Sequence, residues 1–294
     1  MDRTPPELWH QIFSFACTDT GYTGRSLSLV SKYIHATSQP YKLQSISLCG
    51  VKMIMAFAAL LTRIPPHFRR LRYLFVSTRN RNMSDIRSDI IWKQLQEGPT
   101  AVALEQILHD AAPSLEVLEL NLEYHPAFDL NQITSFPHLT DLTSHGGYPI
   151  MLKLPQAPLI TPCTSLRYLH VIFKHDHLHG SRYFNSISFF APYLTHLRFS
   201  DVAQEVWFAE FLKVGLGLDV ESIYTPLVKP LPTTIEQVVV RPMAYHTSFT
   251  CEIPDDRVSL LPPPADEQPG SLAPISERDW LDRISGGKGC WGKL

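Results

Sequence analysis

Leu166-Arg167-Tyr168-Leu169-His170-Val171 is one copy of a six-residue pattern that recurs along this chain. Two variable positions follow the first apolar residue, and one variable position separates the second apolar residue from the third. Each copy predicts a short strand of a parallel sheet, with its aliphatic residues in the core and its variable positions exposed. The other full copies are Leu43–Leu48, Leu71–Val76, Leu115–Leu120, Leu194–Phe199 and Ile235–Val240, and degenerate copies begin at Leu139 and Val220.

Most neighbouring copies begin 24 to 28 residues apart, although one interval is 44 residues and the last is 15. A proline often stands just before the strand, where a returning helix must end. Apolar residues at helical spacing lie in several of the intervening segments, for example Ile54, Phe57 and Leu61. The longest interval has room for a further helix near 84–96. Pattern and period resemble leucine-rich repeats and predict an irregular solenoid of strands and return helices over residues 43–253.

Before the repeats, residues 1–42 carry the pattern of a small helical module. Thr4-Pro5-Pro6-Glu7 has the form of a helix start, with the threonine as the cap and proline in the first turn. Leu8, Ile12 and Phe15 belong to an apolar stripe too wide for one neighbour. A second periodic segment runs from Leu27 to Thr37 and stops at Pro40.

The N-terminal stretch resembles an F-box of the type found in fungal proteins. The matching segments are Pro5-Pro6-Glu7-Leu8-Trp9, Ile12-Phe13-Ser14-Phe15 and Gly24–Ile34. The resemblance implies a helical module that binds a Skp-type adaptor and so joins a cullin ubiquitin ligase, while the remaining chain holds a protein substrate. The adaptor-binding residues it implies are Pro6, Leu8, Ile12, Leu27, Val30 and Ile34.

Composition limits the partners and the compartment. With 26 basic and 28 acidic residues the net charge is −2, so no strong global field attracts nucleic acid or an anionic membrane. The N-terminus lacks the layout of a signal peptide, and the most apolar run, 51–61, is too short to cross a bilayer. Five widely spaced cysteines without a C-x-x-C pair favour a reducing compartment, the cytosol or the nucleus.

The C-terminal part changes character after residue 253. The proline-rich stretch 254–274 predicts an extended linker. Residues 275–294 predict a short helix with Trp280, Leu281 and Ile284 on one face. We expect this segment to fold back and cover an open end of the solenoid.

Catalytic motifs are absent from the sequence, which contains no nucleophile elbow, zinc-protease helix or phosphate-binding loop. His175, His177 and His179 would share one face of a strand and could bind Zn²⁺. However, the run ends at Gly180-Ser181, which favours a solvated loop. We therefore predict no metal site, no cofactor and no catalytic activity of its own.

The variable strand positions suggest where a protein substrate would bind, because tyrosine and arginine are enriched at protein interfaces. The pattern exposes Arg72, Tyr73, Phe75, Glu116, Glu119, Asn121, Arg167, Tyr168, His170, Thr195, His196, Arg198, Glu221 and Tyr224. Six of these are the predicted substrate-binding residues: Arg72, Tyr73, Arg167, Tyr168, His196 and Arg198.

The sequence thus predicts an α/β protein, and the F-box resemblance implies that it recruits substrates to a ubiquitin ligase. The alternative is a non-catalytic leucine-rich-repeat scaffold whose N-terminal helices only cap the first repeat. In a cap, the apolar residues Leu8, Ile12, Val30 and Ile34 would be buried against the first repeat; in an adaptor-binding module this apolar face would be exposed.

Overall fold

The computed structural model describes residues 4–78, 98–122, 135–145, 161–173, 180–202, 206–218, 221, 223–243, 253–263 and 272–292. The chain is an α/β protein that divides into two compact units. The first comprises Met1–Asn121 and Ser271–Lys293, and the second is formed mainly by Leu122–Gly270. Over the ranges given above, no helix has both the length and the apolar character needed to cross a bilayer.

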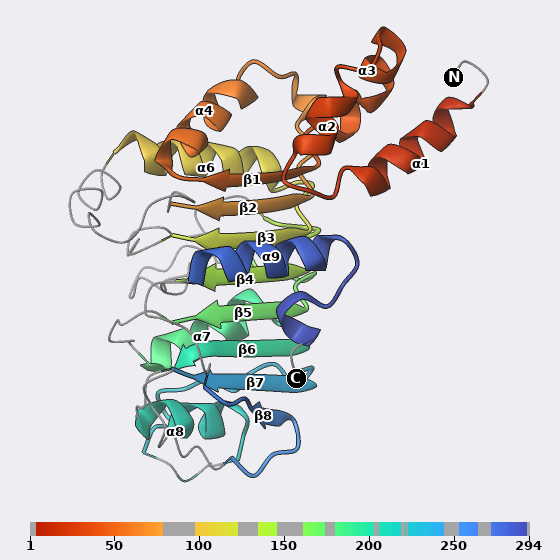
Figure 1. Ribbon diagram of the computed structural model, residues 1–294. Helices are drawn as coiled ribbons and strands as arrows, with labels where there is room; N and C mark the ends of the chain where they lie inside the picture. Colours follow the sequence, from red (N-terminus) through yellow and green to blue (C-terminus); the bar gives the residue numbers. More distant parts are fainter. Residues whose placement is uncertain are drawn as a thin grey trace. The chain divides into compact units, whose positions relative to one another are not determined.

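Three parallel strands form the sheet of the first unit (Figure 1). They are β1 (Ser45–Cys49), β2 (Tyr73–Ser77) and β3 (Val117–Asn121), and they pair in chain order. Equivalent repeat positions stand side by side, as in the row Leu48, Val76 and Leu120. The connecting helices α4 (Val51–Leu61) and α6 (Pro99–Ala111) contact each other, and a short helical turn, η2 (Pro66–Phe68), precedes β2.

The second unit contains five more parallel strands, paired in chain order. Its strands are β4 (Asp141–His145), β5 (Tyr168–Ile172), β6 (His196–Val202), β7 (Gln237–Pro242) and β8 (Val258–Leu260). Helices α7 (Gly180–Phe190) and α8 (Val206–Gly215) belong to the same unit. Phe199 on β6 is fully buried, and its ring meets the rings of Phe173, Phe184 and Phe208 at centroid distances of 5.2 to 5.9 Å.

The predicted strands are present at seven copies of the pattern, and each begins two residues after the first apolar position. Thus β2 begins at Tyr73 after Leu71, and β5 begins at Tyr168 after Leu166. A backbone contact explains this offset. The N–H groups of Arg72 and Tyr73 both donate to the Gln44 carbonyl, and equivalent pairs of N–H groups do the same at β3, β5, β6 and β7. The first apolar residue of each copy therefore lies in the turn that precedes the strand, where it is buried.

Three predictions from the sequence fail or cannot be placed. Strand β8 lies within 254–274, so the prediction of an extended linker is wrong for Val258–Leu260. This strand forms its hydrogen bonds with β7, and the composition of residues 254–274 does not predict that pairing. At the degenerate copy that begins at Val220, Ile223 lies in a turn, whereas Val220 itself is outside the described residues, as is the helix expected near 84–96.

The C-terminal helix α9 (Leu272–Ile284) packs on β2 and β3 and is followed by a helical turn, η4 (Gly289–Gly292) (Figure 1). The Trp280 ring lies 5.7 Å from that of Phe75 on β2. The expectation that this segment covers an end of the strand series is therefore wrong, because α9 lies on the sheet face. Trp280 and Ile284 are buried there in a cluster with Phe75, and Leu281 packs against this cluster, so apolar burial favours the sheet face.

The sheet face predicted to be exposed is largely buried. Phe75, Glu119 and Asn121 in the first unit are 1%, 4% and 0% exposed, and His170 and Arg198 in the second are 6% and 3% exposed. Alternation along a strand assigns side chains to two faces, but it does not say whether the second face is covered. For Phe75 the cover is α9.

At the N-terminus the structure has three helices where the pattern predicts two: α1 (Pro6–Ala16), α2 (Tyr22–Leu27) and α3 (Lys32–Ser38), with a short turn, η1 (Gln39–Tyr41), after them. Pro5, not Thr4, occupies the cap position of α1. Between α2 and α3 the chain bends at 28–31, and Ser31 caps α3 by accepting a hydrogen bond from the Ile34 N–H. All three helices belong to the first unit.

Candidate protein-binding surface

Helix α1 presents an apolar stripe to solvent. Leu8, Ile12 and Phe15 are 48%, 49% and 80% exposed. At about 100° per residue, these positions fall within roughly 60° of one another around the helix. Phe13 points elsewhere, is 2% exposed and stacks on Trp9 at 5.4 Å. The helix therefore has one apolar side in the protein and a second one in water.

The bend between α2 and α3 adds further exposed apolar side chains. Leu29, Val30 and Tyr33 are 81%, 57% and 41% exposed. The bend is held by its own backbone and by His35, whose Nδ1 donates to the Ser28 carbonyl at 2.9 Å. Helices α1, α2 and α3 contact one another, so these residues and the α1 stripe belong to one helical cluster. We call Leu8, Ile12, Phe15, Leu29, Val30 and Tyr33 the exposed apolar set.

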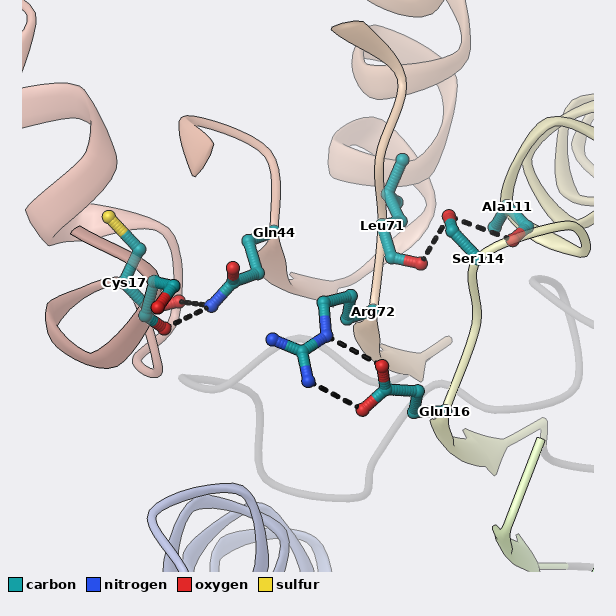
Figure 2. Close-up of polar contacts among 8 residues, drawn as sticks. Cys17, Gln44, Leu71, Arg72, Ala111, Ser114 and Glu116 are labelled. Atoms are coloured by element: carbon teal, nitrogen blue, oxygen red, sulfur yellow. Dashed lines mark hydrogen bonds and ion pairs between the residues drawn. The ribbon is translucent and has the colours of Figure 1, made fainter. Parts of the chain in front are cut away.

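Specific polar contacts attach this helical cluster to the sheet of the first unit. The Gln44 side-chain amide donates to the carbonyls of Ser14, at 2.7 Å, and Cys17, at 3.3 Å (Figure 2). Asp19 accepts from the N–H groups of Gly21 and Thr23, both at 2.8 Å, and so fixes the start of α2. The helices are thus joined to the start of β1 by hydrogen bonds, and the exposed apolar set is not buried by this attachment.

A close backbone approach fixes α2 as well. A Cβ atom at Gly24 would stand 2.6 Å from the Lys42 carbonyl oxygen, so only glycine fits there without displacing the backbone. Gly24 lies in the segment that resembles an F-box, and its role here is packing against the chain just before β1.

The six predicted adaptor-binding residues do not share one environment. Pro6, Leu8, Ile12 and Val30 are exposed, and Leu27 is half-buried. Ile34 is only 3% exposed, so its assignment to the surface is wrong. It packs inside because the bend at 28–31 turns α3, a change of direction that uninterrupted helical spacing does not reveal. Phe15, Leu29 and Tyr33 are exposed but are not among the predicted adaptor-binding residues, although Phe15 lies on the same helix stripe as Leu8.

Two of the predicted substrate-binding residues lie in the first unit. Arg72 forms a bidentate ion pair with Glu116 of the next repeat, with Nε–Oε1 at 2.7 Å and Nη2–Oε2 at 2.9 Å (Figure 2). Its guanidinium carbon also lies 5.1 Å from the centre of the Tyr73 ring. Both side chains remain half-buried. The pair is about one-third exposed on each side, so its main effect is orientation and its contribution to stability is small.

The other four lie in the second unit: Tyr168 is on β5, directly after Arg167, and His196 and Arg198 are on β6. Tyr168 and His196 stand opposite each other in the register, and their rings are 4.5 Å apart. The Arg167 guanidinium donates to the carbonyls of Thr164 and Leu166, which ties it to its own turn. Tyr168, His196 and Arg167 are half-buried.

Arg198 differs from these three because it is buried. Its Nε donates to Ser200 Oγ at 3.3 Å, and His170 Nε2 lies 2.9 Å from the same oxygen. The prediction that Arg198 is exposed for substrate binding is therefore wrong. Burying a charged group without hydrogen bonds is costly. The buried Arg198 guanidinium therefore uses its donors inside the protein, where it orients the neighbouring side chains.

The two buried cysteines, Cys17 and Cys163, show no sign of nucleophilic activation. Burial, and to a smaller extent the negative charge of Asp19, raise the pKa of Cys17 to about 11. Burial raises the pKa of Cys163 to about 11 as well. Both thiols are therefore protonated at neutral pH, whereas the thiolate is the reactive form.

Native-state labelling should reproduce this division of the cysteines. With a thiol-specific alkylating reagent at pH 7, we expect Cys49 and Cys290, which are half-buried, to react at least tenfold faster than Cys17 and Cys163. Peptide mass spectrometry after brief labelling measures the rates, and full labelling in denaturant is the control. Fast labelling of Cys17 in the folded protein would contradict its burial.

Within the ranges that the structure covers, no three histidine, cysteine or acidic side chains are arranged to hold a metal ion. The histidine run at 175–179 lies outside the described residues. Comparison with protein-family models found no match for this sequence, and comparisons with curated proteins and with solved structures found none either. Any role of the exposed apolar set must therefore be inferred from its own geometry and chemistry.

Proposed function

We propose that this chain is the substrate-recruiting subunit of an SCF-type cullin ubiquitin ligase in the cytosol or nucleus. Its N-terminal helices bind a Skp-type adaptor, and its repeat region, an irregular leucine-rich-repeat-like solenoid, binds a protein substrate. The chain itself performs no bond-making step. It raises the rate by holding the substrate near the transferred ubiquitin, which increases local concentration and improves orientation.

The exposure of Leu8, Ile12 and Phe15 is the observation that carries this proposal. A helix that only capped the first repeat would bury its apolar residues, since burial is the main source of stability for a short helix. Here α1 leaves three large apolar side chains in water, and the bend after α2 adds Leu29 and Val30. Gathered apolar exposure of this kind is typical of protein-binding surfaces.

The repeated register supports the solenoid part of the proposal. Leu142, Leu169, Leu197 and Val238 occupy one row of the second unit, as equivalent positions of stacked repeats would. The pair of N–H groups that donates to the preceding repeat's carbonyl recurs in both units. Each repeat thus uses its neighbour in the same way, which is the defining property of repeat proteins.

The scaffold alternative keeps one specific observation in its favour. Phe13, Cys17 and Ile34 are buried, and Gln44 ties α1 to the start of β1. Those contacts are what a cap on the first repeat needs. They leave the exposed apolar set unexplained, so the two functions separate experimentally at that surface.

The decisive experiment is co-purification of the full chain with a Skp-type adaptor from the same source. In a variant carrying Leu8→Asp and Val30→Asp, we expect the affinity for the adaptor to fall at least about 30-fold, since each substitution places a charge in an apolar interface. The thermal midpoint should change by no more than about 3 °C, because surface substitutions rarely alter stability.

A variant carrying Met53→Asp and Leu60→Asp is the matched control. These α4 residues are 52% and 45% exposed, the same change of charge is introduced, and both lie outside the N-terminal helices. It should bind the adaptor like the unmodified chain. Equal loss in both variants would attribute the effect to charge alone, and no binding by the unmodified chain would favour the scaffold.

A further inference from the structure

Helix α9 occupies part of the surface on which the sequence places the substrate. It is the last long helix of the chain, it follows every strand of the second unit, and it nevertheless packs on β2 and β3 of the first. The face it covers includes Phe75, which is 1% exposed, with Tyr73 and Val117 beside it. A sheet face that accepts a helix from a distant part of the sequence can accept a helix of similar chemistry from another protein.

A small apolar cluster and one hydrogen bond join α9 to the sheet among the described contacts. Trp280 and Ile284, one helical turn apart, enter the cluster around Phe75, and Leu281 packs against its border. Glu277 accepts a hydrogen bond from the Ser47 hydroxyl. The anchors therefore follow a simple pattern: a carboxylate, an aromatic residue three positions later, and an aliphatic residue four positions after that.

Two observations indicate that this packing can open without unfolding the sheet. The helix has 13 residues, a length that is marginal without tertiary contacts. The Trp280 indole N–H is buried and has no hydrogen-bond partner within the described structure, so the docked helix leaves one polar group unsatisfied. Segments held by a small apolar cluster open locally at a lower free-energy cost than the core.

We propose that the β1–β3 face is a helix-binding surface, that α9 is its exchangeable occupant, and that its partner is an amphipathic helix with the same anchor pattern. The partner carries a carboxylate, an aromatic residue three positions later and an aliphatic residue four positions after the aromatic. This deepens the proposed function, on which the partner's role as ligase substrate rests. Helix binding itself does not require the adaptor, so the two can fail separately.

The test uses a fluorescent peptide with the chain's own residues 272–292 and the full-length protein. Trp280→Ala weakens the resident helix, so the peptide should bind this variant at least tenfold more tightly than it binds the unmodified protein. Adding Phe75→Ala to that variant should weaken binding at least tenfold. Arg278→Ala, an exposed position on the same helix, is the matched control and should behave like the unmodified protein.

A second peptide that keeps only the three anchors, in an otherwise unrelated sequence, tests the partner class. It should bind Trp280→Ala within tenfold of the first peptide and lose binding when its aromatic anchor becomes alanine. Failure of either peptide to bind a folded Trp280→Ala protein overturns the proposal. Co-purification of this variant with the Skp-type adaptor, measured in parallel, shows whether the proposed function stands independently.

Hydrogen exchange on the unmodified protein decides the matter even if Trp280→Ala does not fold. Amides of residues 276–284 should exchange at least tenfold faster than those of β2 and β3, because α9 opens while the sheet stays closed. Equal protection of the helix and the strands would overturn the proposal. A dimer of the unmodified chain that Phe75→Ala abolishes would assign the face to a second copy and would also overturn it.

Discussion

Ile34→Asp should unfold the N-terminal helices, whereas Val30→Asp, four residues earlier, should be tolerated. Ile34 is 3% exposed, so the new carboxylate would enter an apolar site without a partner. We expect a loss of about 4 kcal/mol in the free energy of unfolding, at the upper end of single-residue effects. Val30 is 57% exposed, and its replacement should cost about 0.5 kcal/mol or less. Urea denaturation followed by circular dichroism measures both.

This pair of variants separates two readings of the same sequence segment. Both residues belong to the set that the F-box resemblance implies for adaptor binding. If Ile34→Asp folds normally and loses only adaptor binding, then Ile34 contacts the adaptor and is not part of the core. If Val30→Asp is as destabilising as Ile34→Asp, the exposed apolar set is part of the core, and this result would favour the scaffold alternative.

Phe199→Ala should be the most damaging single truncation in the second unit. The Phe199 ring is fully buried and meets three other phenylalanine rings, at 5.2 Å in the case of Phe208. Removing it deletes those contacts and leaves a cavity, so we expect a loss of about 3–5 kcal/mol. Thermal and chemical denaturation of the full chain measure the change.

Phe189→Ala supplies the matched control, because it removes the same ring from the same unit. Phe189 is 41% exposed, and it makes a cation–π contact with Lys229, whose Nζ lies 3.8 Å from the ring centre. An exposed cation–π contact is worth about 0.5–1 kcal/mol, so the loss should not exceed about 1.5 kcal/mol. Similar losses for the two variants would mean that the aromatic cluster around Phe199 is not the core of this unit.

Sequence alone was sufficient to place β1 to β7. The repeat beginning at Leu71 and the one beginning at Leu166 both produce a strand two residues later, because each apolar triad has to lie beside its equivalents in neighbouring repeats. The pattern failed at β8, where three residues form a strand only because β7 offers its edge. It also failed at Ile34, where a bend redirects a helix that the spacing describes as continuous.

The candidate surface was only partly readable from the sequence. The motif pointed to Leu8, Ile12 and Val30, which are exposed, but it also included Ile34, which is not. Periodicity identifies an apolar side of a helix without identifying its neighbour. On α1 the stripe is wide, and only the packing of Phe13 inside the protein shows which part of the stripe faces water.

By itself, the sequence determined that this is an α/β protein whose repeats supply the strands, since those features depend on residues close together in the chain. Tertiary structure decided which faces are covered. Ser47 and Glu277 are 230 positions apart, yet their hydrogen bond helps to hold α9 on a sheet face that alternation alone would leave open. Burial is a property of the neighbour as much as of the residue, and no local pattern around Phe75 specifies that Trp280 will cover it.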